Sequence, residues 1–200
     1  MLKEFNAARH KEAFYLAKRG QIKQAMNVYR GMLTILPNDE KAHYNLATLL
    51  KRQGKFEEAI AHYSDAVRLK PDYTYAHYNL GELAQRQGKV EEALKHYRRA
   101  LLLMPGLVPA LNNLAWLLAT YPDPVYRDVP AAIRLAEKAC ELTNNKEPLL
   151  LYTLSVTYAA ASRFSDAQAT AKIALNLALA TGNHRLAEKV RKQITLYEGQ

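Results

Sequence analysis

The sequence predicts an all-α solenoid of about five helical hairpins, closed at its C-terminal end by one further helix. A motif recurs every 34 residues, and glycine and proline recur at fixed places within each period. Apolar residues follow helical spacing in stretches of about 14 residues, two to each period. Because one hairpin cannot bury its apolar face alone, hairpins of this kind must stack on one another.

The period is seen most clearly by aligning segments of the chain. Residues 42–47 (AHYNLA) match residues 76–81 (AHYNLG). The register persists in residues 52–59 (RQGKFEEA) and 86–93 (RQGKVEEA), and residues 18–25 (KRGQIKQA) fit the same template. Such agreement over successive periods indicates that one structural unit is repeated along the chain.

Each unit also contains residues that start, stop and pack its two helices. A glycine is expected to end the first helix, because it accepts a left-handed backbone without steric cost: Gly20, Gly54 and Gly88. A proline near the end of the second helix is expected to stop it: Pro37, Pro71 and Pro105. Small residues, Ala47 and Gly81, are expected to let the two helices pack closely.

The repeat resembles the tetratricopeptide repeat (TPR), and the resemblance extends over nearly the whole chain. The matching positions are Leu46, Ala47, Ala59, Tyr63, Ala66 and Pro71, then Leu80, Gly81, Ala93, Tyr97, Ala100 and Pro105. The resemblance implies a right-handed superhelical solenoid. It also implies that the first helix of each hairpin lines a concave groove, which usually holds an extended peptide.

The repeats predict one TPR domain over residues 1–200. We expect repeats at about 6–39, 40–73, 74–107, 108–146 and 148–181, with a capping helix at about 184–197. The fourth repeat has a longer loop between its helices, and Asp128 is expected to cap the second of them. This repeat resembles TPR segments of large bacterial proteins.

One asparagine recurs at a groove position in three successive repeats: Asn45, Asn79 and Asn113. A carboxamide is both a hydrogen-bond donor and an acceptor, so a row of asparagines could bind the main chain of an extended peptide without specificity for its side chains. We expect the three to lie on one continuous concave face with Arg52 and Arg86. The alternative is that each asparagine bonds to a neighbouring helix or to water.

Basic residues accompany the asparagines: Lys18, Arg52 and Arg86 are 34 residues apart, and Lys51 adjoins Arg52. If they face the groove, they would favour acidic segments or a terminal carboxylate. The alternative is that they serve the helix dipole and solubility. Chaperone-binding TPR proteins use a clamp of lysine, asparagine and arginine, which this chain does not reproduce, since Glu12 and Ala13 stand near those positions.

Aromatic residues of the groove helices are the remaining candidates for ligand contact: Tyr44, Tyr75, Tyr78, Trp116 and Tyr152, of which Tyr44, Tyr78 and Trp116 are the expected groove residues. Tyrosine and tryptophan bury a large area at low entropic cost, which makes them good anchors for a partner. The alternative is packing within the hairpin, which is the better interpretation for Tyr63 and Tyr97.

These features favour a protein-binding adaptor, whose partner is a protein or peptide that is acidic or has a free C-terminus. A self-associating homo-oligomeric scaffold and the non-catalytic arm of a larger enzyme are alternatives. RNA binding is suggested by 18 Lys and Arg against 11 Asp and Glu in residues 1–107. The basic excess is modest, however, and the helical-repeat family that reads RNA base by base has another repeat length.

The sequence argues against an enzyme, a cofactor or a metal site. It has no glycine-rich phosphate loop, serine elbow or paired-histidine zinc motif, and its single cysteine, Cys140, is expected to be a small buried hydrophobe. The histidines lack carboxylate or thiolate partners at ligand spacing, so no metal is expected. With neither a signal peptide nor an apolar stretch that could span a membrane, the predicted location is the cytoplasm.

Overall fold

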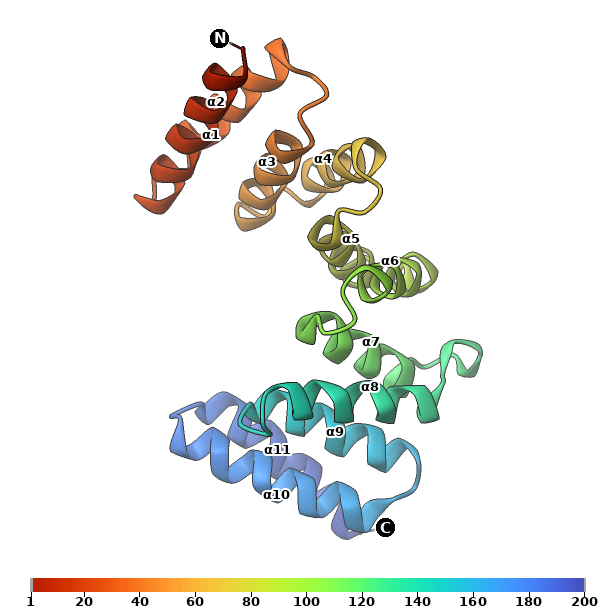
Figure 1. Ribbon diagram of the computed structural model, residues 1–200. Helices are drawn as coiled ribbons and strands as arrows, with labels where there is room; N and C mark the ends of the chain where they lie inside the picture. Colours follow the sequence, from red (N-terminus) through yellow and green to blue (C-terminus); the bar gives the residue numbers. More distant parts are fainter. Residues whose placement is uncertain (1, 200) are drawn as a thin grey trace. The chain divides into compact units, whose positions relative to one another are not determined.

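The computed structural model describes residues 2–199, and it contains eleven α-helices, one short 3₁₀ helix and no strand in that range (Figure 1). The prediction of an all-α fold is confirmed. The elements are α1 (Leu2–Lys18), α2 (Ile22–Ile35), α3 (Glu40–Arg52), α4 (Phe56–Leu69), α5 (Thr74–Arg86), α6 (Val90–Leu103), α7 (Val108–Thr120), η1 (Pro124–Tyr126), α8 (Val129–Leu142), α9 (Pro148–Ala160), α10 (Phe164–Ala180) and α11 (His184–Glu198). Among these helices none is long and apolar enough to cross a membrane.

The helices form two compact units, the first ending at Leu103 and the second beginning at Met104. In the first unit α1 packs on α2, α3 on α4 and α5 on α6, and neighbouring hairpins meet where α2 contacts α3 and α4 contacts α5. In the second unit α9 packs against α7, α8 and α10, and α11 covers α10. The predicted organisation as one domain stays a prediction.

Glycine and proline lie at the helix ends where the sequence predicts them. Gly20, Gly54 and Gly88 have φ of 78°, 74° and 74°, and each lies just after the first helix of its hairpin. Ser162 has a φ of 59° at the turn between α9 and α10, where no glycine is present. The helices α2, α4 and α6 end two residues before Pro37, Pro71 and Pro105, as expected.

Aspartates cap two of the described α-helices. Asp128 accepts a hydrogen bond from the Ala131 amide at 3.0 Å, which confirms its predicted place at the start of α8. Asp39 caps α3, and its other carboxylate oxygen accepts from Asn6 Nδ2 at 2.7 Å, which ties α1 to the start of α3. Burial opposes ionisation of Asp39, but the hydrogen bonds that it accepts outweigh burial and lower its pKa.

Tyr63 and Tyr97 are fully buried within their hairpins, which confirms their interpretation as packing residues. The space left by Gly81 in α5 is occupied by the Tyr97 ring. A Cβ atom added at Gly81 would lie 2.7 Å from Tyr97 Cδ1 and 2.8 Å from Cε1. Close packing at this position therefore depends on the missing side chain of Gly81.

We expect Gly81→Ala to destabilise the chain and Gly31→Ala to stabilise it. Both glycines lie in helices, where alanine gains about 1 kcal/mol of helix propensity. A Cβ at Gly31 meets nothing within 4 Å, so the gain remains. At Gly81 overpacking against a buried ring costs about 1–3 kcal/mol and is expected to exceed the gain. Thermal unfolding followed by circular dichroism measures both changes, and a Gly81→Ala variant as stable as Gly31→Ala would contradict the described packing.

Candidate functional site

A hollow of about 400 Å³ lies between the first and second hairpins. Its lining comes from α1, α2 and α3, and we call it the α1–α3 hollow: Phe14, Ala17, Lys18, Tyr29, Asn45, Thr48, Leu49 and Arg52. The structure thus brings together three of the predicted groove residues, Lys18, Asn45 and Arg52. The nearly buried Tyr29 and Leu49 give the hollow an apolar floor, whereas the Phe14 side chain is 59% exposed at its edge.

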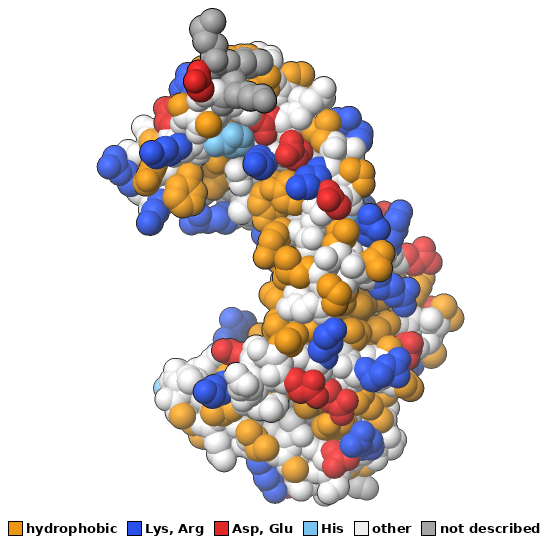
Figure 2. Space-filling model, in the orientation of Figure 1, with side chains coloured by type: hydrophobic (Ala, Val, Ile, Leu, Met, Phe, Trp, Pro, Cys, Tyr) orange, Lys and Arg blue, Asp and Glu red, His pale blue; other side chains and the backbone are white. Residues whose placement is uncertain are grey.

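The two cations of the α1–α3 hollow stand at helix ends. Lys18 is the last residue of α1 and Arg52 the last of α3, and both are exposed. Figure 2 shows Lys and Arg side chains near the C-terminal end of α1, beside exposed hydrophobic side chains. In the part of the chain that the structure describes, neither Lys18 nor Arg52 forms an ion pair. Their positions complement the helix dipole and also leave both charges available to a ligand.

Asn45 is half-buried and lines the hollow beside Tyr29. Burial of the ring raises the pKa of Tyr29, and the Asn45 side chain acts in the opposite direction. A carboxamide has two donor hydrogens and an acceptor oxygen, which gives Asn45 the capacity to bind a peptide main chain.

The side chain of Asn79, the equivalent residue of the next hairpin, forms hydrogen bonds within the protein. Lys51 Nζ donates to Asn79 Oδ1 at 2.6 Å and to Glu82 Oε2 at 3.0 Å. Asn79 Nδ2 donates to the Tyr75 carbonyl at 2.8 Å, and the Asn79 side chain is buried. The structure therefore shows Asn79 bonded to a residue of a neighbouring helix, which was the alternative interpretation. A role of Asn79 in peptide binding stays a prediction.

The other predicted residues of the first unit take part in ring contacts. The Arg86 guanidinium carbon lies 4.1 Å from the centre of the Phe56 ring, a cation–π contact. The half-buried Tyr44 stacks on Tyr73, with ring centres 4.7 Å apart. Tyr78 is also half-buried, and its ring centre lies 6.1 Å from that of Tyr97. None of these residues lines the α1–α3 hollow.

Asn113 and Trp116 belong to the second unit, on α7. Both are half-buried. Asn112 Nδ2 donates to Asn113 Oδ1 at 3.3 Å, and the Trp116 ring centre lies 5.8 Å from that of Tyr152 on α9. The alignment of Asn113 with Asn45 and Asn79 in one groove stays a prediction.

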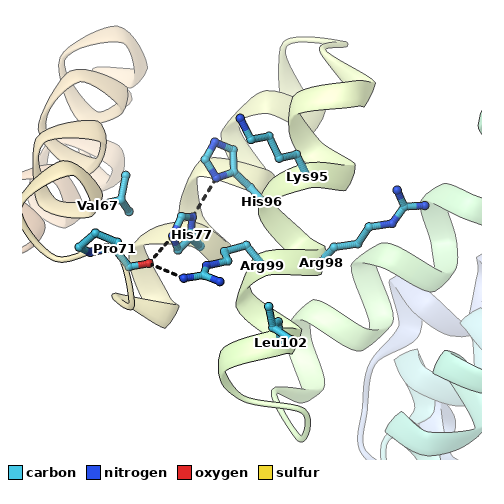
Figure 3. A pocket seen from close by; sticks show the side chains of 8 residues that line it. All are labelled: Val67, Pro71, His77, Lys95, His96, Arg98, Arg99 and Leu102. Atoms are coloured by element: carbon cyan, nitrogen blue, oxygen red, sulfur yellow. Dashed lines mark hydrogen bonds between the residues drawn. The ribbon is translucent and has the colours of Figure 1, made fainter.

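A second hollow, of about 450 Å³, lies against the third hairpin (Figure 3). Its lining combines cations, two histidines and apolar side chains: Val67, Pro71, His77, Lys95, His96, Arg98, Arg99 and Leu102. The Nδ1 atoms of His77 and His96 are 3.1 Å apart. Burial, and then the neighbouring His77, lower the pKa of His96 to about 4, so this imidazole is neutral at pH 7. This hollow was not predicted from the sequence, although three cations within five residues of one helix were a signal.

The second hairpin holds a related group, formed by His43, His62 and Asp65. The expectation that the histidines lack a carboxylate partner was wrong, because Asp65 Oδ2 lies 3.6 Å from His43 Nδ1. The missed signal was that His62 and Asp65 are three residues apart and so share a face of α4. Cys140 is buried as expected, and burial with the nearby Glu137 and Glu141 raises the pKa of its thiol to about 11.

Comparison with known proteins finds a family model that matches about a third of the chain. Residues 44–109 match the sequence model of the tetratricopeptide repeat. No curated protein matches the sequence. Among solved structures, the chain is similar to YrrB, described as a TPR protein with an unusual peptide-binding site, at 19% identity and a TM-score of 0.74, over 92% of this chain and 90% of YrrB.

Two further solved structures share the fold. MamA is 18% identical with a TM-score of 0.72, over 90% of this chain and 96% of MamA. PilF of Pseudomonas aeruginosa is 19% identical with a TM-score of 0.70, over 100% of this chain and 95% of PilF. At these identities the likeness concerns the fold alone, which is that of a TPR solenoid.

Proposed function

We propose that this chain, which has the fold of a TPR solenoid and matches the tetratricopeptide repeat at residues 44–109, is a binding scaffold that holds an acidic peptide segment in its α1–α3 hollow. One observation carries the proposal: Lys18, Asn45 and Arg52, predicted from register alone, line a single hollow over an apolar floor. The two cations have no carboxylate partner in the described part of the chain.

Each part of the hollow suits a different part of a peptide. The Arg52 guanidinium can hold a carboxylate with two parallel hydrogen bonds, and Lys18 adds a second positive charge. The Asn45 carboxamide can bond to main-chain N–H or C=O groups. The ring of Phe14, which is 59% exposed, offers an apolar surface for a neighbouring side chain. A side-chain carboxylate and a C-terminal carboxylate present the same chemistry to the two cations.

The comparisons support a binding role in general terms. The fold is shared with YrrB, whose description names a peptide-binding site. A solenoid of hairpins offers extended surface, and binding specificity comes from a few side chains on it.

Peptide selection on the purified chain tests the proposal. We expect a displayed library of random peptides to be enriched in Asp and Glu, and expect the selected peptides to lose binding when each acid is changed to its amide. Synthetic versions with a free or an amidated C-terminus distinguish a terminal carboxylate from side-chain acids. Enrichment of basic or uncharged apolar peptides would contradict an acidic ligand.

A further inference from the structure

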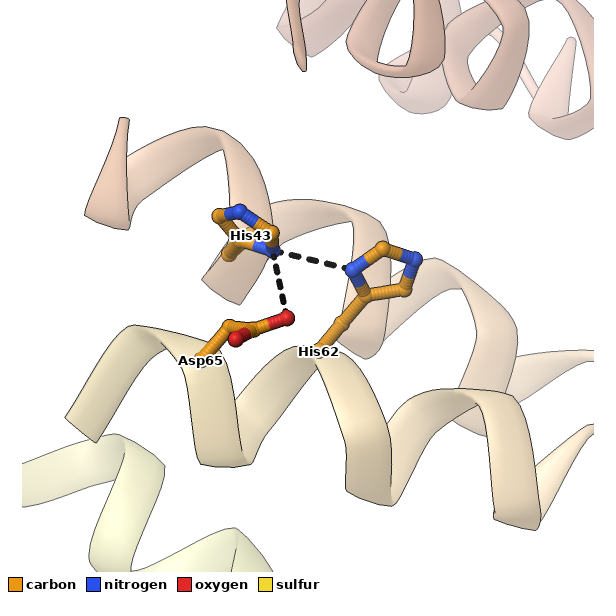
Figure 4. Close-up of side chains that lie close together, drawn as sticks. All are labelled: His43, His62 and Asp65. Atoms are coloured by element: carbon orange, nitrogen blue, oxygen red, sulfur yellow. Dashed lines mark hydrogen bonds and ion pairs between the residues drawn. The ribbon is translucent and has the colours of Figure 1, made fainter. Parts of the chain in front are cut away.

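Three potential metal ligands converge within the second hairpin, apart from the α1–α3 hollow (Figure 4). His43 Nδ1 on α3 lies 2.9 Å from His62 Nδ1 and 3.6 Å from Asp65 Oδ2, both on α4. One ligand atom from each residue lies within 4.8 Å of the other two. Tetrahedral zinc with bonds of about 2.0–2.1 Å places its ligand atoms about 3.3 Å apart, a value that lies between the two spacings from His43 Nδ1.

The proton on His43 is placed by its other nitrogen. His43 Nε2 lies 3.0 Å from the carbonyl oxygen of Pro37, which can only accept a hydrogen bond. The hydrogen of the neutral ring is therefore on Nε2, and Nδ1 turns a lone pair toward His62 and Asp65. A carboxylate oxygen 3.6 Å from an imidazole lone pair is repulsive unless a proton or a metal ion lies between them.

Surrounding groups hold two of the three side chains in this orientation. His43 is 7% exposed and is fixed by its bond to Pro37. Asp65 Oδ1 accepts from Arg68 Nη2 at 2.9 Å and Nε at 3.3 Å, which leaves Oδ2 directed toward the histidines. Outer hydrogen bonds of this kind orient the ligands in metal sites of proteins.

The third hairpin provides an internal comparison 34 residues further along the chain. His77 and His96 repeat the facing pair, with Nδ1 atoms 3.1 Å apart, and His77 Nε2 lies 3.2 Å from the Pro71 carbonyl. At the position of Asp65 stands Arg99, which donates to that same carbonyl at 3.4 Å. The two hairpins thus share the histidine pair, but at the position of Asp65 the third hairpin has a cation.

We propose that His43, His62 and Asp65 bind one divalent transition-metal ion, with zinc as the first candidate. Two imidazoles and a carboxylate suit Zn²⁺, and the same imidazole nitrogens would also accept Co²⁺ or Ni²⁺. Three protein ligands leave the fourth tetrahedral position for water or for a carboxylate of a partner. The ion would bridge α3 and α4 and so stabilise the second hairpin.

Zinc titration of the metal-free, tag-free chain tests the proposal, with a chromogenic chelator in competition and circular dichroism to monitor folding. We expect one zinc ion per chain and a higher midpoint of thermal unfolding when zinc is bound. Co²⁺ at the same site is expected to give the intense visible absorption of tetrahedral coordination. Asp65→Arg, which recreates the third hairpin, is expected to weaken binding at least about 10-fold without loss of helicity.

Two further variants separate the site from adventitious binding to histidine. Changing both His77 and His96 to Gln is expected to leave one zinc ion bound with unchanged affinity. Arg99→Asp is expected to build a second site and raise the stoichiometry to two. The proposal is overturned if a folded Asp65→Arg variant binds zinc as tightly as the wild type, or if the wild type binds none.

Discussion

Replacing Tyr97 with alanine is expected to lower the free energy of unfolding by about 3–5 kcal/mol. The ring is fully buried between α5 and α6, in the space that Gly81 leaves, and its hydroxyl donates to Gln85 Oε1 at 2.7 Å. Truncation removes the ring contacts, leaves a cavity that rigid helices cannot fill, and leaves the Gln85 carboxamide without this partner.

Urea denaturation followed by circular dichroism measures the loss, with Tyr75→Ala as a matched control on the same hairpin. Tyr75 is 47% exposed, so its truncation is expected to cost less than about 1 kcal/mol. Because repeats are stabilised by their neighbours, amide hydrogen exchange should show the Tyr97→Ala effect first in α5 and α6. A cost at Tyr97 no larger than at Tyr75 would show that the ring is not the centre of this hairpin's core.

Arg52→Glu is expected to weaken binding of a selected acidic peptide by about 10- to 100-fold, the equivalent of about 1.5–3 kcal/mol for a hydrogen bond to a charged group. The change removes a donor from the α1–α3 hollow and puts a negative charge beside Lys18. Arg52 is exposed and forms no ion pair in the described part of the chain, so only the loss of its favourable place at the end of α3 is expected to lower stability, by less than about 1 kcal/mol. Isothermal titration calorimetry at two salt concentrations gives the affinity and its electrostatic share.

Arg98→Glu is the control for net charge, because it makes the same charge change at an exposed residue of the second hollow. We expect it to alter affinity by less than about 3-fold, since screening weakens charges beyond about 10 Å. If Arg98→Glu abolishes binding while Arg52→Glu does not, the acidic ligand belongs to the hollow of the third hairpin.

Local features of the fold were predictable because each depends on residues close in sequence. The sequence predicts the turns at glycine, the helix ends before proline and the cap at Asp128, because each depends only on residues within a few positions of a helix end. The burial of Tyr63 and Tyr97 follows from their register within one hairpin. Placing Lys18, Asn45 and Arg52 around one hollow needed the repeat period as well, because these residues come from two hairpins.

Side-chain contacts between helices were less predictable, since a long side chain can reach several different neighbours depending on its rotamer. Asn79 shares its register with Asn45, yet Lys51 and Glu82 engage it, because a lysine at position 51 reaches across to α5. Arg86 likewise turns to the Phe56 ring. The approach of Asp65 to His43 depends on how α3 faces α4, which the spacing along either helix alone does not specify.

Site-specific photo-crosslinking tests whether the peptide binds in the α1–α3 hollow. A benzophenone amino acid replaces Phe14 in one variant and Leu102, which is 71% exposed and lines the second hollow, in another. We expect a selected acidic peptide to crosslink at position 14 but not at position 102, and Arg52→Glu to remove the crosslink. Crosslinking at position 102 alone, or at position 14 regardless of Arg52→Glu, would contradict binding in this hollow.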